Sequence, residues 1–553
     1  MIRKRIILIP LLLAAVFACQ KLPDDNGAQP SGEKTEQPEP LDASCELLSL
    51  KATASDGSSI IFSFNGRSDT FHAKWLTWIE GTDPELFTLA FETNGKAVRH
   101  EGKALESGVS KISLSEVADL VVEAESGDTR TYHVSLNCPQ INRELPLMRI
   151  RPEKAITSKE EYVDAIVDLS SPFTESGWWS EEDGKVQVRG RGNSTWVLPK
   201  KPYRLKFPEK VSPIGLDHAV EKSWVILAHD MDKSLIRNHL GFMMSRILFD
   251  PAENYHDPMA ILFTPCSQFV NLYMGDDYAG VYQMSDQMNR AEGRIAVEKL
   301  TAKDGSDPAK ITGGHILETD VHSEVPPVRF SSKVKNIQVN HKYPDEDDHD
   351  PAQYAYIENY LAEAETVLYG SNFTDPENGW RKYFDEKTLI DYMIVKELAA
   401  DMDGYISTYL YKRRGCDKFF FGPVWDVDKG WDNETRVAAD YLQQMMVYSG
   451  FAMPGSDKRH WYYRFCEDKS FRQALNLRWR AKRNQLLSAI YKELGSLPAR
   501  MPMAIEANFT VWPFYYQAST EAKMPEASYE AEIARIKRLT EERAAVLDRE
   551  FAK

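Results

Sequence analysis

The sequence predicts an α+β protein in which a small all-β sandwich precedes a larger mixed domain. Over 45–140, short runs in which apolar and polar residues alternate are separated by turn residues, which is the pattern of half-buried strands. From residue 145 onward, strand-like and helix-like stretches are mixed. The chain closes with an amphipathic helical pattern at 526–551. These three observations favour two domains of different architecture.

Length and composition agree with this organisation. The 553 residues exceed what one hydrophobic core usually serves, so at least two domains are expected. Hydrophobic residues make up 42% of the chain and aromatic residues 11%, which is typical of globular proteins. The formal net charge is −16 and no long basic run is present, so we expect no nucleic-acid partner.

Residues 1–19 have the pattern of an export signal. Arg3, Lys4 and Arg5 precede an apolar run at 6–18 that is too short to span a bilayer. The following Cys19 is similar to the lipidated cysteine of a bacterial lipobox, and an ordinary secretory signal is the alternative. A lipid on Cys19 would anchor the protein to a membrane, and we expect the bacterial cell envelope, at its outer membrane.

Residues 20–44 are rich in Pro, Gly, Glu and Ser and predict a flexible tether. The sandwich over 45–140 then serves as a spacer or as a protein-binding module. Cys45 and Cys138 bracket it, and we expect them to pair because export leads to an oxidising compartment. No CxxC motif or Cys/His spacing typical of structural zinc appears.

The mixed domain is predicted over 145–553 and has a helical C-terminal part. A helix is expected at 233–248, with Asp230 or Asp232 as its N-cap. In a second helix, TLIDYMIVKELAADMD, the apolar residues share one face, and the helix ends at Asp401 and Asp403. Strands are expected at 185–191, 203–207, 223–228, 268–274, 278–284, 406–412 and 418–425. Alternation within 203–207 places the apolar Tyr203, Leu205 and Phe207 on one face and the basic residues on the other.

A basic stretch, VRGRGNSTWVLPKKPYRLKF at 188–207, has the composition of a phosphate-binding turn. Gly190 and Gly192 allow a ligand to approach the backbone closely. Charge comes from Arg189, Arg191, Lys200, Lys201, Arg204 and Lys206. The stretch matches neither a P-loop nor GxGxxG, so a solvated basic hairpin is the alternative.

Two aspartates follow the apolar strand FFFGPVW. Asp426 at a buried strand end is poorly solvated unless a cation meets it, so we predict that Asp426 and Asp428 bind metal. A turn-capping role is the alternative, and DVDKGWDN lacks the glycine and glutamate positions of a calcium loop. Asp403 precedes a predicted strand pair, as a base aspartate does in eukaryotic-type kinases. No HExxH or GxSxG motif is present.

At these residues, over about 145–551, the chain resembles the CotH kinase family of atypical secretory protein kinases. The resemblance rests on the basic stretch, on DKSLIRN (232–238), YAGVYQMSDQ (278–287) and GGHILETD (313–320), and on DMDGYISTYLYK with GPVWDVD. It implies a divergent kinase-like fold that uses ATP with Mg²⁺ or Mn²⁺ to phosphorylate protein hydroxyls.

The resemblance also implies roles for single residues. Asp403 stands at the catalytic position and Asp426 at the metal position, with Asp428 beside it. For the matching basic positions we infer nucleotide binding by Arg191, Lys201, Lys206 and Arg237, and for Asp286 a place beside a phosphate-binding lysine.

Three departures from the family's pattern leave catalysis open. Asp286 stands where the family usually has Glu, and Asp401 stands where Asn is common. Val427-Asp428 stands where the family usually has Phe-Asp after the metal aspartate, and the unusual Lys429 follows.

The sequence therefore predicts an exported, membrane-anchored kinase acting on an unidentified protein substrate. Two alternatives are a non-catalytic cell-surface binding protein with an inactive kinase-like scaffold, and a transferase that attaches AMP or a similar group. The kinase hypothesis requires the aspartates and the basic hairpin to meet in one pocket.

Overall fold

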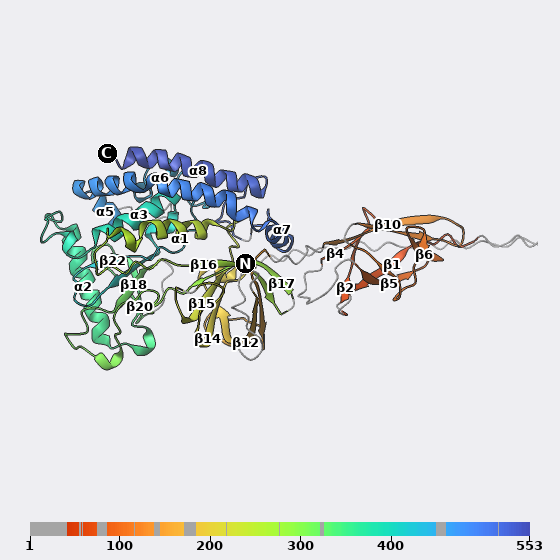
Figure 1. Ribbon diagram of the computed structural model, residues 1–553, viewed down its shortest axis with the longest axis horizontal. Helices are drawn as coiled ribbons and strands as arrows, with labels where there is room; N and C mark the ends of the chain where they lie inside the picture. Colours follow the sequence, from red (N-terminus) through yellow and green to blue (C-terminus); the bar gives the residue numbers. More distant parts are fainter. Residues whose placement is uncertain are drawn as a thin grey trace, which may run out of the picture.

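The computed structural model describes residues 41–553 except 55–56, 58, 75–85, 115–116, 138–143, 171–183, 217, 276, 321–325, 450–459 and 518. The described chain forms two N-terminal β-sheets, then a closed barrel, a five-stranded sheet and a helical region (Figure 1). The signal at 1–19 with Cys19, and the tether up to residue 40, lie outside the described residues. No helix within the described ranges has the length and apolarity needed to cross a membrane.

The N-terminal sheets share one apolar core, as the predicted sandwich requires. Leu50 and Leu89 of one sheet meet Val122 and Val134 of the other. The sheet orders are β2 (Ser59–Ile61), β1 (Leu47–Thr53), β5 (Phe87–Thr93), β8 (Lys111–Ile112), and β3 (Ser63–Asn65), β4 (Thr70–Lys74), β10 (Thr129–Asn137), β9 (Ala118–Glu123), β6 (Ala97–His100), β7 (Lys103–Ala104).

Two details of the sandwich bear on the predictions. The sheets are not wholly antiparallel, because β4 and β10 pair in parallel. Cys45 carries a free thiol, whereas Cys138 lies outside the described residues, so their pairing stays a prediction.

The barrel closes through a parallel pair between its first strand and β16. Alternation along β14 is confirmed, since Tyr203, Leu205 and Phe207 are buried and Lys206 is exposed. The strand order is β11 (Leu147–Pro152), β12 (Val163–Ser170), β13 (Lys185–Gly190), β14 (Tyr203–Val211), β15 (Glu221–Leu227), β17 (Asp277–Asp286), β16 (Ser267–Met274). The strands β11 and β12, which complete the barrel, were not predicted.

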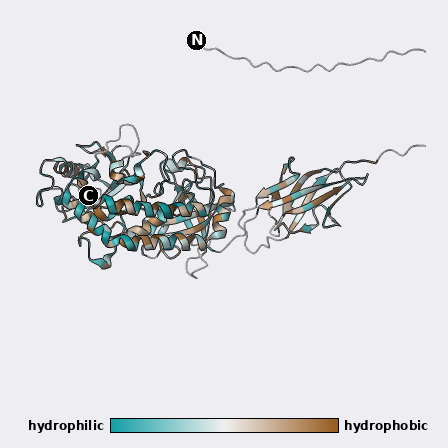
Figure 2. Ribbon diagram, turned by 90° about the horizontal axis from the view of Figure 1, so that it is seen from above, coloured by the Kyte–Doolittle hydropathy of each residue, from teal (hydrophilic) through white to brown (hydrophobic). Residues whose placement is uncertain are grey.

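The helical region is built around α3 (Glu386–Ala399), whose residues 388–399 are all buried. The prediction of one apolar face was therefore incomplete, because α3 is covered on every side. It contacts α1 (Arg237–Leu248), α6 (Lys469–Ala499) and α8 (Tyr529–Glu550), and α6 lies beside α8 (Figure 1). Polar and apolar segments alternate along the C-terminal helices (Figure 2).

The last strand of the five-stranded sheet, β22, also contacts α3. The sheet order is β19 (Arg329–Ser331), β20 (Gln338–Tyr343), β18 (His315–Thr319), β21 (Thr408–Lys412), β22 (Phe419–Phe421). The remaining helices are α2 (Pro351–Tyr369), α4 (Met446–Ser449), α5 (Trp461–Cys466) and α7 (Pro502–Val511).

Two predicted boundaries were wrong for local reasons. The helix α1 begins at Arg237 rather than 233, because Asp232 caps a preceding turn and accepts bonds from the backbone N–H groups of Ser234 and Arg237. The strand β22 ends at Phe421 rather than 425, because Pro423 has no N–H to donate to a ladder.

Candidate active site

Asp401 and Asp403 lie at the C-terminal end of α3, as predicted. Ala400 adopts a left-handed φ of 51°, which ends the helix, and the Asp401 N–H donates back to the Lys396 carbonyl. A 3₁₀ turn at Met402–Tyr405 then carries Asp403.

Lys396 connects this helix end to the segment after β22. Its Nζ donates to Asp401 Oδ2 at 2.6 Å and to the carbonyls of Trp425 at 2.7 Å and Asp426 at 3.0 Å. The side chain is wholly buried, and these bonds use all three N–H groups. Lys396 therefore holds two acidic segments together, although Trp425 and Asp426 lie 29 and 30 positions further along the chain.

The segment carrying Asp426 and Asp428 is fixed through its backbone. Asn238 of α1 accepts a bond from the Val427 N–H at 2.7 Å, and Asn433 donates to the Asp428 carbonyl at 2.8 Å. Asp426 is exposed and has a left-handed φ of 57°, while Asp428 is half-buried. Because the backbone is held in this way, the carboxylates remain available to a ligand.

The carboxylates of the helix-end and strand-end aspartates form a cluster whose negative charge is only partly balanced by nearby cations. Its members are Asp401, Asp403, Asp426 and Asp428. Burial raises the pKa of Asp401 to about 6, and the charges of Asp403 and Asp426 act in the same direction. Burial also raises the pKa values of Asp403 and Asp428. Asp401 is wholly buried, yet its Oδ1 has no hydrogen-bond partner in the described structure. A divalent cation would relieve this arrangement.

The cluster is not a preformed three-carboxylate cage. No three of these aspartates in the described chain bring their oxygens within 4.8 Å of one another. Mg²⁺ in nucleotide sites is commonly held by one or two carboxylates, with phosphates and water completing the shell. A pair such as Asp426 and Asp428 fits that requirement.

Lys429 forms an ion pair with Asp403. Its Nζ lies 3.0 Å from Asp403 Oδ2, 3.3 Å from Glu434 Oε2 and 3.2 Å from Glu521 Oε2. Burial lowers the pKa of Lys429, but the charges of Asp403 and Glu434 outweigh it and raise the pKa above its ordinary value. Lys429 thus stays charged beside the predicted catalytic carboxylate.

Arg191 brings the basic turn to the aspartates. Its guanidinium carbon lies 5.8 Å from the ring centroid of Trp425, directly before Asp426. Burial lowers the pKa of Arg191, while the charges of Asp426 and Asp428 act in the opposite direction, so the groups interact electrostatically. Arg191 of the basic hairpin therefore lies near the acidic segment, and a single pocket that joins the two stays a prediction.

The two lysines of the hairpin make other contacts. Lys201 Nζ donates to the carbonyls of Trp196 at 2.9 Å and Leu198 at 3.2 Å, which closes the turn. Lys206 is exposed on β14, and its Nζ lies 5.6 Å from the ring centroid of Tyr162. Their nucleotide contacts stay predictions.

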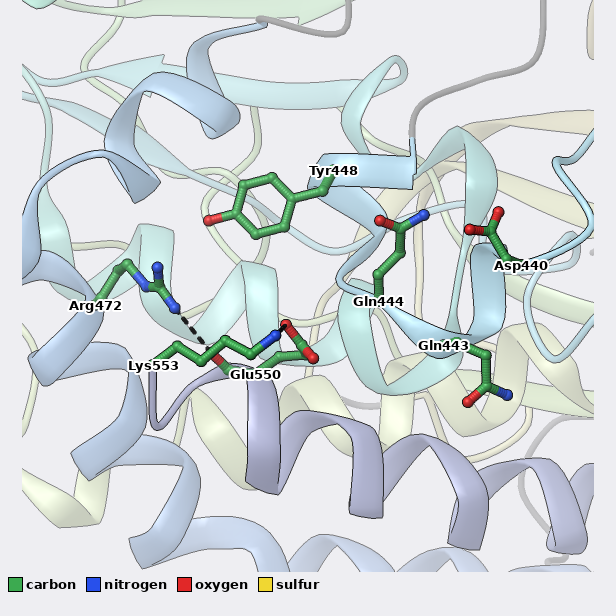
Figure 3. A pocket seen from close by; sticks show the side chains of 7 residues that line it. All are labelled: Asp440, Gln443, Gln444, Tyr448, Arg472, Glu550 and Lys553. Atoms are coloured by element: carbon green, nitrogen blue, oxygen red, sulfur yellow. Dashed lines mark hydrogen bonds and ion pairs between the residues drawn. The ribbon is translucent and has the colours of Figure 1, made fainter.

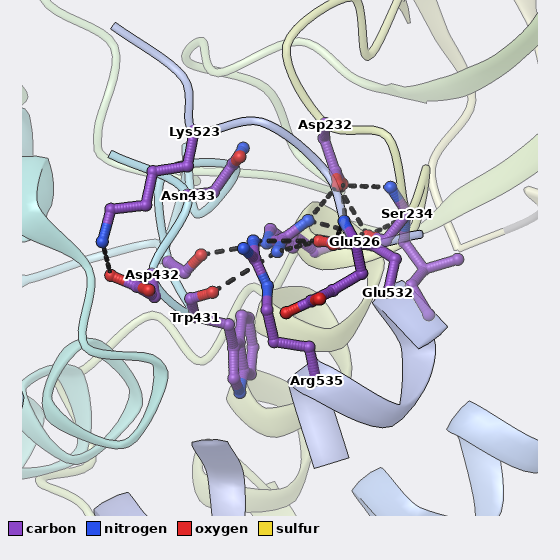
Figure 4. A network of polar contacts seen from close by, with 12 residues as sticks. Asp232, Ser234, Trp431, Asp432, Asn433, Lys523, Glu526, Glu532 and Arg535 are labelled. Atoms are coloured by element: carbon purple, nitrogen blue, oxygen red, sulfur yellow. Dashed lines mark hydrogen bonds and ion pairs between the residues drawn. The ribbon is translucent and has the colours of Figure 1, made fainter. Parts of the chain in front are cut away.

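Arg237 is wholly buried. Its side-chain partners Asp232, Ser234 and Glu532 belong to the polar network of Figure 4. Its five N–H groups are matched by acceptors on Gly430, Trp431, Asp232, Ser234 and Glu532. Two of these acceptors are backbone carbonyls just beyond Asp428. Arg237 therefore positions the aspartate segment in this structure, and no donor is left for the phosphate contact that was predicted.

Asp286 ends β17 and lies in a different polar group. Its Oδ1 accepts from Arg294 Nε at 2.7 Å, and its Oδ2 interacts with His218 Nε2 at 2.7 Å. Among the described residues, Arg294 rather than a lysine pairs with the Asp286 carboxylate, so the lysine–carboxylate pair inferred from the resemblance is not seen in this part of the chain.

A polar cavity of about 500 Å³ near the C-terminus contains none of the predicted site residues (Figure 3). Its cations are already engaged, since Arg472 donates to the Glu550 carbonyl at 2.9 Å and Lys553 pairs with the Glu550 carboxylate at 2.6 Å. The remaining lining residues are Asp440, Gln443, Gln444 and Tyr448.

The helix-end aspartates, the strand-end aspartates and the arginine turn define a site suited to an anionic ligand held with a divalent cation. The family described as CotH kinase protein matches residues 188–547, which include all of these side chains. The chain therefore belongs to the CotH kinase family. Membership implies a kinase-like fold and the use of ATP. A search of curated proteins found no match.

Sequence reasoning missed Asn238 and Lys396. Asn238 lies inside DKSLIRN, but a pattern of residues does not reveal which backbone an amide side chain will hold. Lys396 did carry a signal, because a lysine among the apolar residues of a long buried helix requires a specific partner.

Proposed function

We propose that this protein is an exported, lipid-anchored atypical protein kinase that transfers the γ-phosphate of ATP to hydroxyl groups of a protein substrate. Its main support is the convergence of Arg191 with the aspartate cluster. Membership of the CotH kinase family supports kinase chemistry. Export and anchoring rest on the signal at 1–19 and on Cys19.

The proposed roles follow from the positions of the side chains. Asp403, at the helix end, orients the acceptor hydroxyl and accepts its proton. Arg191 approaches the phosphates from the barrel side. Asp426 and Asp428 hold Mg²⁺ or Mn²⁺, which when bound screens the charge of the phosphates. The unpartnered Oδ1 of Asp401 supports a cation at this place.

One observation favours a second candidate, a non-catalytic cell-surface binding protein. Lys429 pairs with Asp403 at 3.0 Å, so this carboxylate is engaged by a cation, whose charge lowers its pKa against the raising effect of burial. In this alternative the sandwich and the kinase-like scaffold bind a partner without transferring phosphate.

A labelling experiment separates these functions. Protein lacking residues 1–19 is incubated with Mn²⁺ and ATP labelled at either the α- or the γ-phosphate. A kinase transfers the γ-label to itself or to a generic protein acceptor, and both Asp403→Ala and Asp426→Ala abolish the transfer. Glu542→Gln, on the exposed face of α8, is the matched control and should label normally.

The other outcomes identify the alternatives. Transfer of the α-label alone indicates attachment of AMP. Absence of transfer, together with no change of Tm in millimolar ATP and Mn²⁺, supports the binding protein, because a ligand that binds the native state raises stability by RT ln(1 + [L]/Kd).

A further inference from the structure

Three metal-ligand side chains converge on the barrel, outside the candidate active site. His218 lies between β14 and β15, Cys266 directly precedes β16, and Asp286 ends β17. Their ligand atoms all lie within 4.8 Å of one another. No other group of three His, Cys, Asp or Glu side chains in the described ranges is as close.

Hydrogen bonds hold the carboxylate of this group in place. Arg294, which is 1% exposed, donates from Nε to Asp286 Oδ1 at 2.7 Å. Oδ2 faces the other two residues, since it lies 2.7 Å from His218 Nε2 and accepts from the Cys266 backbone N–H at 3.0 Å. Carboxylates that bind metals are commonly oriented by such outer contacts. Arg294 therefore orients Asp286 without occupying the oxygen that faces the cysteine and histidine.

The ligand types favour one class of cation. A thiolate, an imidazole nitrogen and a carboxylate oxygen are the ligands of Zn²⁺, and three protein ligands leave a fourth position for water. Mg²⁺ and Ca²⁺ prefer oxygen ligands alone. The cations expected in the active site are therefore poorly suited to this group.

We propose that His218, Cys266 and Asp286 form a binding site for a borderline-soft divalent cation of the Zn²⁺ class. The ion ties His218, which lies between β14 and β15, to the start of β16 and the end of β17 and so stabilises this part of the barrel. The site is separate from the proposed ATP site, and the inference does not depend on kinase activity.

Co²⁺ is the spectroscopic probe for this site, because a bond between cobalt and a thiolate gives a charge-transfer absorption in the near ultraviolet. Reduced protein lacking residues 1–19 is titrated with Co²⁺, and Zn²⁺ is then added in competition. The wild-type protein should develop the absorption and lose it to Zn²⁺. Cys416→Ser removes another half-buried free cysteine and should leave the absorption intact.

Two variants make the result decisive. Cys266→Ser should abolish the absorption, and His218→Ala should weaken Zn²⁺ binding at least about tenfold. Circular dichroism confirms folding, and the exposed position of His218 makes that variant the safer of the two. No absorption in the wild-type protein, or equal absorption in Cys266→Ser, would show that the three side chains form only a hydrogen-bonded group and would overturn the proposal.

Discussion

Replacing Arg237 with methionine tests whether this arginine positions the aspartate segment or binds a nucleotide. Its guanidinium is wholly buried, with Nη1 2.5 Å from Asp232 and Nη2 2.7 Å from Glu532. Methionine fills a similar length of the site but supplies no donors. The variant leaves two buried carboxylates without their shared cation, and the carbonyls of Gly430 and Trp431 without a donor.

The expected cost follows from the partners that remain. Removing one member of a buried ion pair usually costs about 3–5 kcal/mol. Asp232 keeps bonds from Ser234, and Glu532 keeps a bond from Arg535 at 3.0 Å. Because both carboxylates retain donors, we expect a loss near the lower limit, about 3 kcal/mol in the free energy of unfolding.

Urea unfolding measures this loss as a shift in the transition midpoint of the C-terminal domain. The matched control is Arg538→Met on α8, whose 3.4 Å pair with Glu542 is exposed on both sides. That change should cost about 0.5 kcal/mol or less. The comparison separates the buried network from the general effect of removing an arginine.

A loss below about 1 kcal/mol for Arg237→Met would refute the positioning role, because a buried ion network cannot be removed so cheaply. A second result would point to a nucleotide contact instead. In that case the variant would keep its stability but lose the rise in Tm that ATP and Mn²⁺ produce in the wild-type protein.

Three further predictions test other parts of the structure. Asp401→Asn should weaken Mn²⁺ binding without nucleotide at least about tenfold in an electron paramagnetic resonance titration, and unchanged affinity would exclude Asp401 from the cation site. Burial raises the pKa of Asp468, but hydrogen bonds outweigh it and lower the pKa to about 2. Its stabilisation is therefore present above the unfolded pKa of about 3.9 and lost as the pH falls toward 2, and Asp468→Asn should flatten this acid loss in pH-dependent melting. Gly241→Ala places a Cβ 2.5 Å from Val427 Cγ2, which should cost about 1–3 kcal/mol, and an unchanged Tm would contradict that packing.

The sequence alone determined the features that depend on local pattern and chain order. Alternation along β14 predicted which residues of 203–207 enter the barrel, because a strand places successive side chains on opposite faces. The helix before Asp403 and the strand pair before Asp426 were likewise predicted from periodicity. Motif order over the whole domain was sufficient to indicate the CotH kinase family.

The tertiary structure decided which side chains meet. Arg191 lies near the aspartates, whereas Arg237 uses its donors in a buried hydrogen-bond network. The sequence alone shows both only as basic positions. Asp286 meets His218 and Cys266 rather than a lysine. The physical reason is that a charged side chain takes its role from the partners that burial brings within a few ångströms, and those partners come from distant parts of the chain.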